Sequence, residues 1–108
     1  MATNNMIMGH LAPAAATPTT LYTVPAGRQA NVNIFVTNTH ASATDYFRLA
    51  LVPNGDSIGT DNYIAYQMPV DSGKSLNYTG IALAAEDLIS IYTTNGTCSF
   101  VATGLEIS

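Results

Sequence analysis

The sequence contains few charged residues and no cluster of positive charge. Only 9% of its 108 residues are charged, with three Lys and Arg against seven Asp and Glu, and the net charge is −4. A typical soluble domain has about 25% charged residues. Arg28, Arg48 and Lys74 are far apart in the chain. Because nucleic-acid binding needs clustered basic side chains to neutralise phosphates, the composition argues against it.

Cysteine and histidine are also scarce. The single cysteine, Cys98, excludes an intrachain disulfide and a zinc site built from cysteines, and its place in an alternating segment predicts a small core or interface residue. His10 and His40 have no acid at metal-ligand spacing, and no Ser-His-Asp arrangement can be proposed from spacing. We therefore predict that the protein is not an enzyme and has no catalytic residues, cofactor or metal.

Long apolar runs are absent as well. No run approaches the length of a membrane span, and residues 1–5 lack the basic and apolar regions of a secretory signal. The expectation is a protein with no membrane partner, made and kept in the cytosol until it assembles.

The chain does contain repeated period-2 alternation. Pro25 and Gly27 suit a tight turn, and the segment that follows places Ala30, Val32, Ile34 and Val36 on one side of a strand. At least four further segments alternate in the same way, and Asn95-Gly96 is a strong hairpin signal. Residues 81–89 fit either a short helix or a loop that leads into a strand. The predicted core residues are Val32, Ile34, Val36, Phe47, Leu49, Leu51, Ile89 and Ile91.

These patterns predict an all-β fold, an antiparallel β-sandwich of about eight strands that is jelly-roll or immunoglobulin-like. Residues 1–18 are expected to form an extended N-terminal arm, because Pro13 and Pro18 disfavour a helix there. Residues 19–108 are expected to form the β-sandwich domain. Residues 6–11, inside the arm, could instead pair as an integral edge strand.

The polar part of the sequence is mostly Thr, Asn and Ser, so a surface of this composition can be buried without desolvating many charges. This indicates a protein that works in an assembly. The apolar residues of the arm, with one tyrosine of a predicted strand, are the candidate partner contacts: Met6, Ile7, Met8, Leu11 and Tyr63. Alternation also places Tyr63 and Tyr66 on opposite faces of that strand.

Three phrases carry a resemblance to a known family: Leu21-Tyr22-Thr23-Val24-Pro25-Ala26-Gly27, Phe47-Arg48-Leu49-Ala50-Leu51, and the segment from Leu83 to Tyr92. Together they resemble small virion structural proteins of tailed bacteriophages. The resemblance implies a virion component assembled in the host cytoplasm, and the small size favours a capsid decoration or cement protein. Its implied partners are copies of itself, as a homotrimer, and the major capsid protein. The alternatives are a tail or tail-fibre component and a carbohydrate-binding module for a host glycan.

Overall fold

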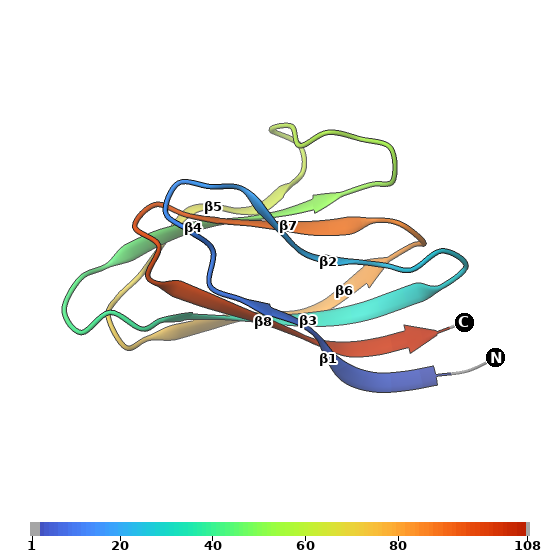
Figure 1. Cartoon of the computed structure of the whole chain (residues 1–108), viewed down its shortest axis with the longest axis horizontal. Helices are drawn as coiled ribbons and strands as arrows, with labels where there is room; N and C mark the ends of the chain where they lie inside the picture. Colours follow the sequence, from blue (N-terminus) through green and yellow to red (C-terminus); the bar gives the residue numbers. More distant parts are fainter. Residues whose placement is uncertain (1–2, 108) are drawn as a thin grey trace.

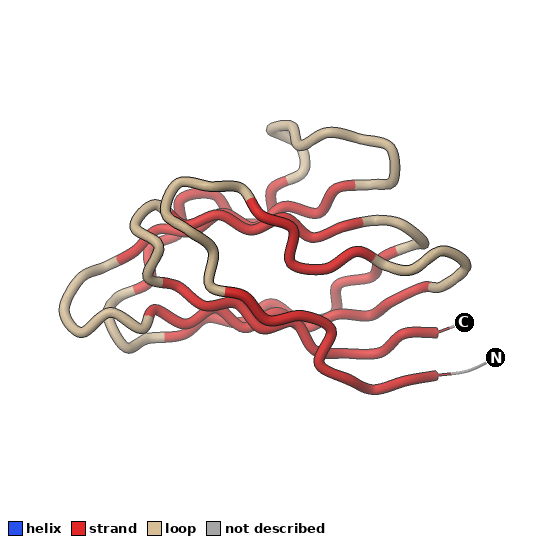
Figure 2. The backbone as a smooth tube through the Cα atoms, in the orientation of Figure 1, coloured by secondary structure: helices blue, strands red, loops and turns tan. Residues whose placement is uncertain are grey.

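The computed structural model describes residues 3–107, which form eight strands in two facing sheets (Figure 1). Figure 2 shows that loops alone connect these strands, and residues 3–107 contain no helix that could cross a membrane. The predicted all-β sandwich of about eight strands is confirmed. The strands are β1 (Thr3–Leu11), β2 (Thr19–Thr23), β3 (Gln29–Asn38), β4 (Asp45–Val52), β5 (Tyr63–Val70), β6 (Ser75–Leu83), β7 (Leu88–Thr93) and β8 (Cys98–Ile107).

The strand order decides between the two topologies that the sequence left open. Strands pair antiparallel from the two ends of the chain inward, β1 with β8, β2 with β7, β3 with β6 and β4 with β5. Two additional pairings, β3 with β8 and β4 with β7, join these strand pairs into sheets ordered β1-β8-β3-β6 and β2-β7-β4-β5. An eight-stranded ribbon rolled up in this way is a jelly roll.

The alternating residues point inward and form the core between the sheets. In β3 the burial alternates along the strand, as the sequence predicted. Seven of the eight predicted core residues are fully buried, and the eighth, Leu51, is partly buried and packs against the core. Phe47 lies at the centre, in edge-to-face contact with Phe100 and Tyr78 at centroid distances of 5.9 and 6.2 Å.

The predicted turns are present where their residues require them. Arg28 N–H donates to the Pro25 carbonyl at 3.2 Å, and Gly27 has a positive φ of 76° that suits glycine. Gly96 has a φ of 74° in the turn between β7 and β8. The segment 81–89 contains a turn between β6 and β7, which is the loop alternative.

The first residues of the chain are extended, but they form part of a sheet. β1 pairs with β8 from Thr3 opposite Ile107 to Leu11 opposite Phe100, with a bulge between Ile7 and Gly9. A Cβ at Gly9 would lie 2.5 Å from the Leu21 carbonyl oxygen, so β1 approaches β2 closely at this point. Residues 3–11 are thus an edge strand, the alternative that the sequence left open, and residues 12–18 connect the two sheets.

Candidate functional site

The predicted contact residues lie in two separate places. Met6, Ile7 and Leu11 are exposed on β1, and Ile7 is the most exposed of them at 66%, whereas Met8 packs against the core. Tyr63 is on β5, the edge strand of the other sheet. β1 contacts β2, which is at the opposite edge from β5 in that sheet. The structure therefore does not bring Tyr63 together with the β1 residues.

Tyr63 belongs instead to a cluster on the outer face of the β2-β7-β4-β5 sheet. We call Arg48, Tyr63, Tyr66 and Tyr92 the tyrosine–arginine patch. The guanidinium carbon of Arg48 lies 4.5 Å from the ring centroid of Tyr66 and 4.2 Å from that of Tyr92. Such cation–π contacts hold an arginine head group in one place. Tyr63 and Tyr66 meet edge to face, with centroids 4.9 Å apart.

A bulge in β5 creates this cluster. The register between β4 and β5 shifts twice: β5 has one extra residue between Tyr63 and Ala65 and another between Ala65 and Met68, where Gln67 has a positive φ of 51°. Tyr63 and Tyr66 consequently share one side of the sheet, so the expectation from strict alternation that they occupy opposite faces is wrong. An inserted residue reverses the side on which later residues lie, and the sequence carries no plain signal for it.

The second of these shifts, between Ala65 and Met68, places the Gln67 side chain beside Arg48. Arg48 donates from Nε to Gln67 Oε1 at 2.7 Å, and Gln67 donates in turn to the Thr94 hydroxyl at 3.4 Å. Beside these residues, Thr60, Tyr63 and Tyr66 line an open hollow of about 490 Å³, and Tyr66 is 58% exposed. The patch thus combines one exposed and two partly buried tyrosine rings with a cation held against two of them.

The outer face of the other sheet has a different character, and we call it the uncharged face. Glu106 is the one charged residue on β1, β8, β3 and β6 within the described chain, and it is buried. The register places Phe35 beside Val101 and Ile7 beside Thr103 on the outer side. Phe35 is 41% exposed and Ile7 66%. This face offers apolar and uncharged polar groups over its whole width.

Each sheet also buries one carboxylate. Asp45 accepts hydrogen bonds from the backbone N–H groups of Tyr46, Asn95 and Thr97 and from the Thr97 hydroxyl. Burial alone would raise the pKa of Asp45, but these hydrogen bonds outweigh it and lower the pKa below its usual value. Asp45 therefore fixes the turn between β7 and β8 to the start of β4, a structural role.

The second buried carboxylate, Glu106, connects the two sheets. It accepts a hydrogen bond from the Tyr22 hydroxyl and forms an ion pair with Arg28 at 3.0 Å. Burial, together with the hydrogen bond to Glu106 and its charge, raises the pKa of Tyr22 above its ordinary range. The arrangement holds β2 to β8 and leaves no free acid or base.

The remaining chemical groups are also engaged in structure. Cys98 is buried, and this burial, together with the charge and hydrogen bond of Asp45, raises the pKa of its thiol to about 12. His40 Nδ1 accepts backbone hydrogen bonds from Ser42 and Ala43, so it stabilises a turn. No group of His, Cys, Asp and Glu within residues 3–107 could hold a metal ion.

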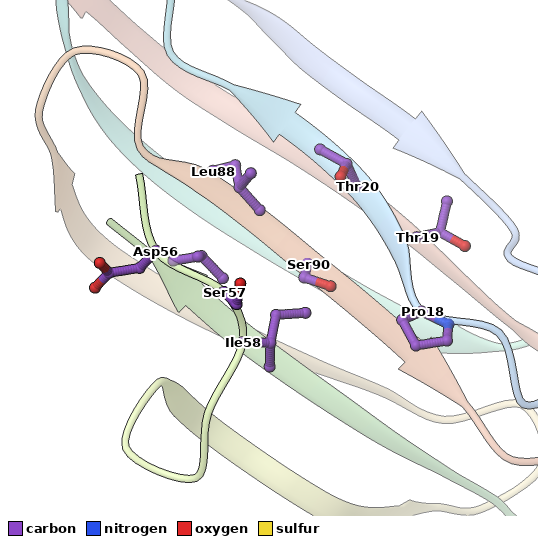
Figure 3. A pocket seen from close by; sticks show the side chains of 9 residues that line it. Pro18, Thr19, Thr20, Asp56, Ser57, Ile58, Leu88 and Ser90 are labelled. Atoms are coloured by element: carbon purple, nitrogen blue, oxygen red, sulfur yellow. The ribbon is translucent and has the colours of Figure 1, made fainter. Parts of the chain in front are cut away.

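A second hollow, of about 230 Å³, lies where the loop between β4 and β5 passes over β2 and β7 (Figure 3). Its lining is mostly Thr, Ser and apolar side chains. Figure 3 shows the Asp56 carboxylate pointing away from the other labelled side chains. The hollow therefore presents no convergent polar groups of the kind that catalysis requires. Its lining residues are Pro18, Thr19, Thr20, Val52, Asp56, Ser57, Ile58, Leu88 and Ser90.

The structure is thus a jelly-roll β-sandwich whose two outer faces differ in charge and aromatic content. A scan with models of known protein families found no match, and a search of curated protein sequences also found none. A chain in the acidic stable capsid structure of Helicobacter pylori bacteriophage KHP30 has a similar fold. Its TM-score is 0.53 at 13% identity, and the match covers 99% of this chain and 94% of that chain.

A second similar structure is that of infectious bursal disease virus, Gx strain. Its TM-score is 0.46 at 11% identity, and the match covers 97% of this chain and 30% of that chain. At these identities the similarity to the bacteriophage KHP30 chain shows a shared fold.

Proposed function

We propose that this chain is a phage virion structural protein, a capsid decoration or cement protein that stabilises the head. The observation that carries the proposal is the match to a chain of the bacteriophage KHP30 capsid structure over nearly the full length of both chains. That chain is therefore a jelly roll of about the same size, rather than a larger shell protein that contains one. The three phrases that resemble small phage virion proteins support the same function.

The surface supports the role by a physical route. The uncharged face can be covered by a capsid without desolvating a charge or ordering long charged side chains. Each contact of so small a domain is weak, but many copies engaged at once raise the avidity by orders of magnitude. The exposed β1 residues Met6, Ile7 and Leu11 lie at the edge of this sheet and are proposed contacts with the major capsid protein. Met8, which packs inward, supports them from below.

The proposed assembly unit is a homotrimer, because the sparse charge leaves little to desolvate when copies associate. The protein joins the virion in the host cytoplasm, and its role is structural and not enzymatic.

The test is to locate the chain in the virions of the phage that encodes it. Antibodies raised against the purified protein are used for gold labelling, and the copy number is measured by mass spectrometry of purified particles. The expected result is labelling over the head at hundreds of copies per particle. Labelling of the tail alone would instead identify a tail or tail-fibre component. Absence from purified particles would overturn the proposal.

A glycan-binding module is the second candidate, and the hollow lined by Tyr63 and Tyr66 favours it. Exposed tyrosine rings can stack on sugar rings. A glycan array with the purified protein separates the two functions. Binding to a host glycan that is lost in Tyr66→Ala would support the second candidate, and the absence of binding would exclude it from this hollow.

A further inference from the structure

The tyrosine–arginine patch holds a positive charge that the chain itself does not neutralise. Within residues 3–107 the one ion pair is that of Arg28 with Glu106, so Arg48 has no carboxylate within 4.0 Å. Arg48 uses Nε for Gln67, and its terminal nitrogens have no acceptor within the described chain. These two nitrogens present N–H groups suited to bind a carboxylate in a bidentate manner.

The same chain contains carboxylates that lack a partner. Of the five outside the core, Asp87 accepts hydrogen bonds from Asn54 and Ala84, Glu86 from Asn54, and Asp71 from Thr44. The carboxylates of Asp56 and Asp61 make neither a hydrogen bond nor an ion pair with the described residues. Both are exposed in the loop from 53 to 62, between β4 and β5. In Figure 1 this loop rises away from the outer surface of the β2-β7-β4-β5 sheet.

We propose that the tyrosine–arginine patch is a carboxylate-binding contact surface whose occupant is the β4–β5 loop of a second copy of this chain, through Asp56 or Asp61. The inference deepens the homotrimer of the proposed function. The argument for a second copy is charge complementarity, since the guanidinium of Arg48 and the carboxylates of Asp56 and Asp61 have no partner of opposite charge within the described residues. An interface in which the patch of one copy binds the loop of the next, without the reciprocal contact, is heterologous, and it closes into a ring when the rotation between copies allows. Three copies related in this way form a trimer.

The patch has the features of an energetically important contact. Arginine and tyrosine are enriched among residues that dominate binding energy at interfaces. The rings of Tyr66 and Tyr92 already hold the guanidinium, so little side-chain freedom is lost when a carboxylate binds. The hollow beside Tyr63 and Tyr66 gives space for the backbone of an incoming loop.

The experiment is sedimentation velocity of the full chain over a micromolar concentration series, with thermal unfolding of each variant as the check on folding. The wild type is expected to form a discrete oligomer. Arg48→Glu is expected to raise its dissociation constant at least about tenfold, as expected for the loss of an interface residue that dominates binding. Asp56→Lys and Asp61→Lys, made separately, identify the carboxylate. Lys74→Glu, which makes the same charge change in a turn away from the patch, is the control and should associate as the wild type does.

A charge exchange within one chain provides the decisive variant. Arg48→Glu combined with the effective loop substitution, Asp56→Lys or Asp61→Lys, should restore the oligomer, because each patch then meets a loop of opposite charge. A monomeric wild type, an oligomer unaffected by Arg48→Glu, or no rescue by the exchange would each overturn the inference. Binding of a carboxylated glycan that is lost in Arg48→Glu while the oligomer persists would also overturn it, and would identify the patch as a glycan site.

The two proposals fail in different ways. If the virion head is labelled but Arg48→Glu leaves the oligomer unchanged, this inference is overturned and the proposed function stands. An oligomer that depends on Arg48 in a chain absent from virions would overturn the proposed function alone.

Discussion

The two outer faces of this sandwich differ more than the two sheets beneath them. Among residues 3–107 the uncharged face is broad and exposes no charged side chain on its strands, whereas the opposite face concentrates an arginine and three tyrosines in one cluster. Burying uncharged groups avoids the large cost of desolvating a charge, but it fixes no particular orientation. A cation held between two rings accepts a carboxylate from a limited set of directions, so it provides specificity. A chain with few charges can thus use one face to bury a large area against a partner and the other face to fix the orientation of a partner.

Beneath these faces the two sheets have equivalent inner layers. Ile34 and Phe100 of one sheet and Phe47 and Leu49 of the other are all fully buried. The sheets do differ in how they satisfy a buried carboxylate. Asp45 accepts its hydrogen bonds mostly from the backbone of one turn, whereas Glu106 depends on the side chains of Tyr22 and Arg28.

The largest expected effect is on folding, and it follows from removing β1, the edge strand of the sheet that carries the uncharged face. Deleting residues 2–11 removes β1 and leaves the β8 edge and the core around Phe100 uncovered. We expect loss of cooperative thermal unfolding, measured by circular dichroism. The matched control is Ile7→Thr, which changes an outward side chain of β1 and should remain folded. A truncated protein that still unfolds cooperatively would show that β1 is a separable arm.

This edge strand shows where sequence reasoning stops. Alternation in β3 was sufficient to predict its buried residues, because β3 pairs with β8 without a register shift along its whole length. β1 is interrupted by Gly9 and followed by two prolines, features that an extended arm and an edge strand share. Only the pairing with β8, about 100 residues away, distinguishes them.

The site was less predictable for a related reason. The sequence identified Tyr63 as a candidate but not the role of Arg48, because the bulge at Gln67 brings the residues of β5 over β4. A bulge depends on which residues pair across strands, and a single sequence does not show this. Asp45 was missed as well, since its partners lie about 50 residues further along the chain.

The next effect in size tests whether the inner layers are equivalent. Ile34 lies under the uncharged face and Leu49 under the tyrosine–arginine patch, and both side chains are fully buried. The variants are Ile34→Ala and Leu49→Ala. Each truncation should lower the free energy of unfolding by about 2–5 kcal/mol, from lost transfer energy and the cavity left behind. Urea denaturation measures the change. A cost near zero at one site and a large cost at the other would mean that one sheet carries the core alone.

The buried carboxylates give a smaller effect that depends on pH. Because the folded pKa of Asp45 lies below the usual value of 3.8, the ionised group stabilises the fold above that pH. The stabilisation is lost as the pH falls through and below that value. Asp45→Asn should cost about 1–3 kcal/mol at pH 7, since it replaces a hydrogen-bond acceptor by a donor. Urea denaturation between pH 7 and pH 3 should also show a weaker loss of stability in the variant than in the wild type.

Asp71→Asn is the control for this prediction. Asp71 is exposed and bonds to Thr44, so the variant should keep both the stability and the pH dependence of the wild type. If Asp45→Asn loses as much stability as the wild type between pH 7 and pH 3, another carboxylate is responsible for the acid sensitivity.

The smallest effects on folding are expected from substitutions of exposed residues, and one on each outer face compares the two faces directly. Phe35→Lys adds a charge to the uncharged face, and Tyr66→Ala removes a ring from the tyrosine–arginine patch. Both side chains are exposed, so each variant should unfold within about 0.5 kcal/mol of the wild type. Their effects on assembly should differ, because a lysine must be desolvated when the uncharged face is covered, whereas Tyr66 supports Arg48. We expect Phe35→Lys to weaken co-sedimentation with undecorated capsids and to leave self-association intact, and Tyr66→Ala to weaken self-association first. If both variants impair the same step equally, the two faces do not have separate roles.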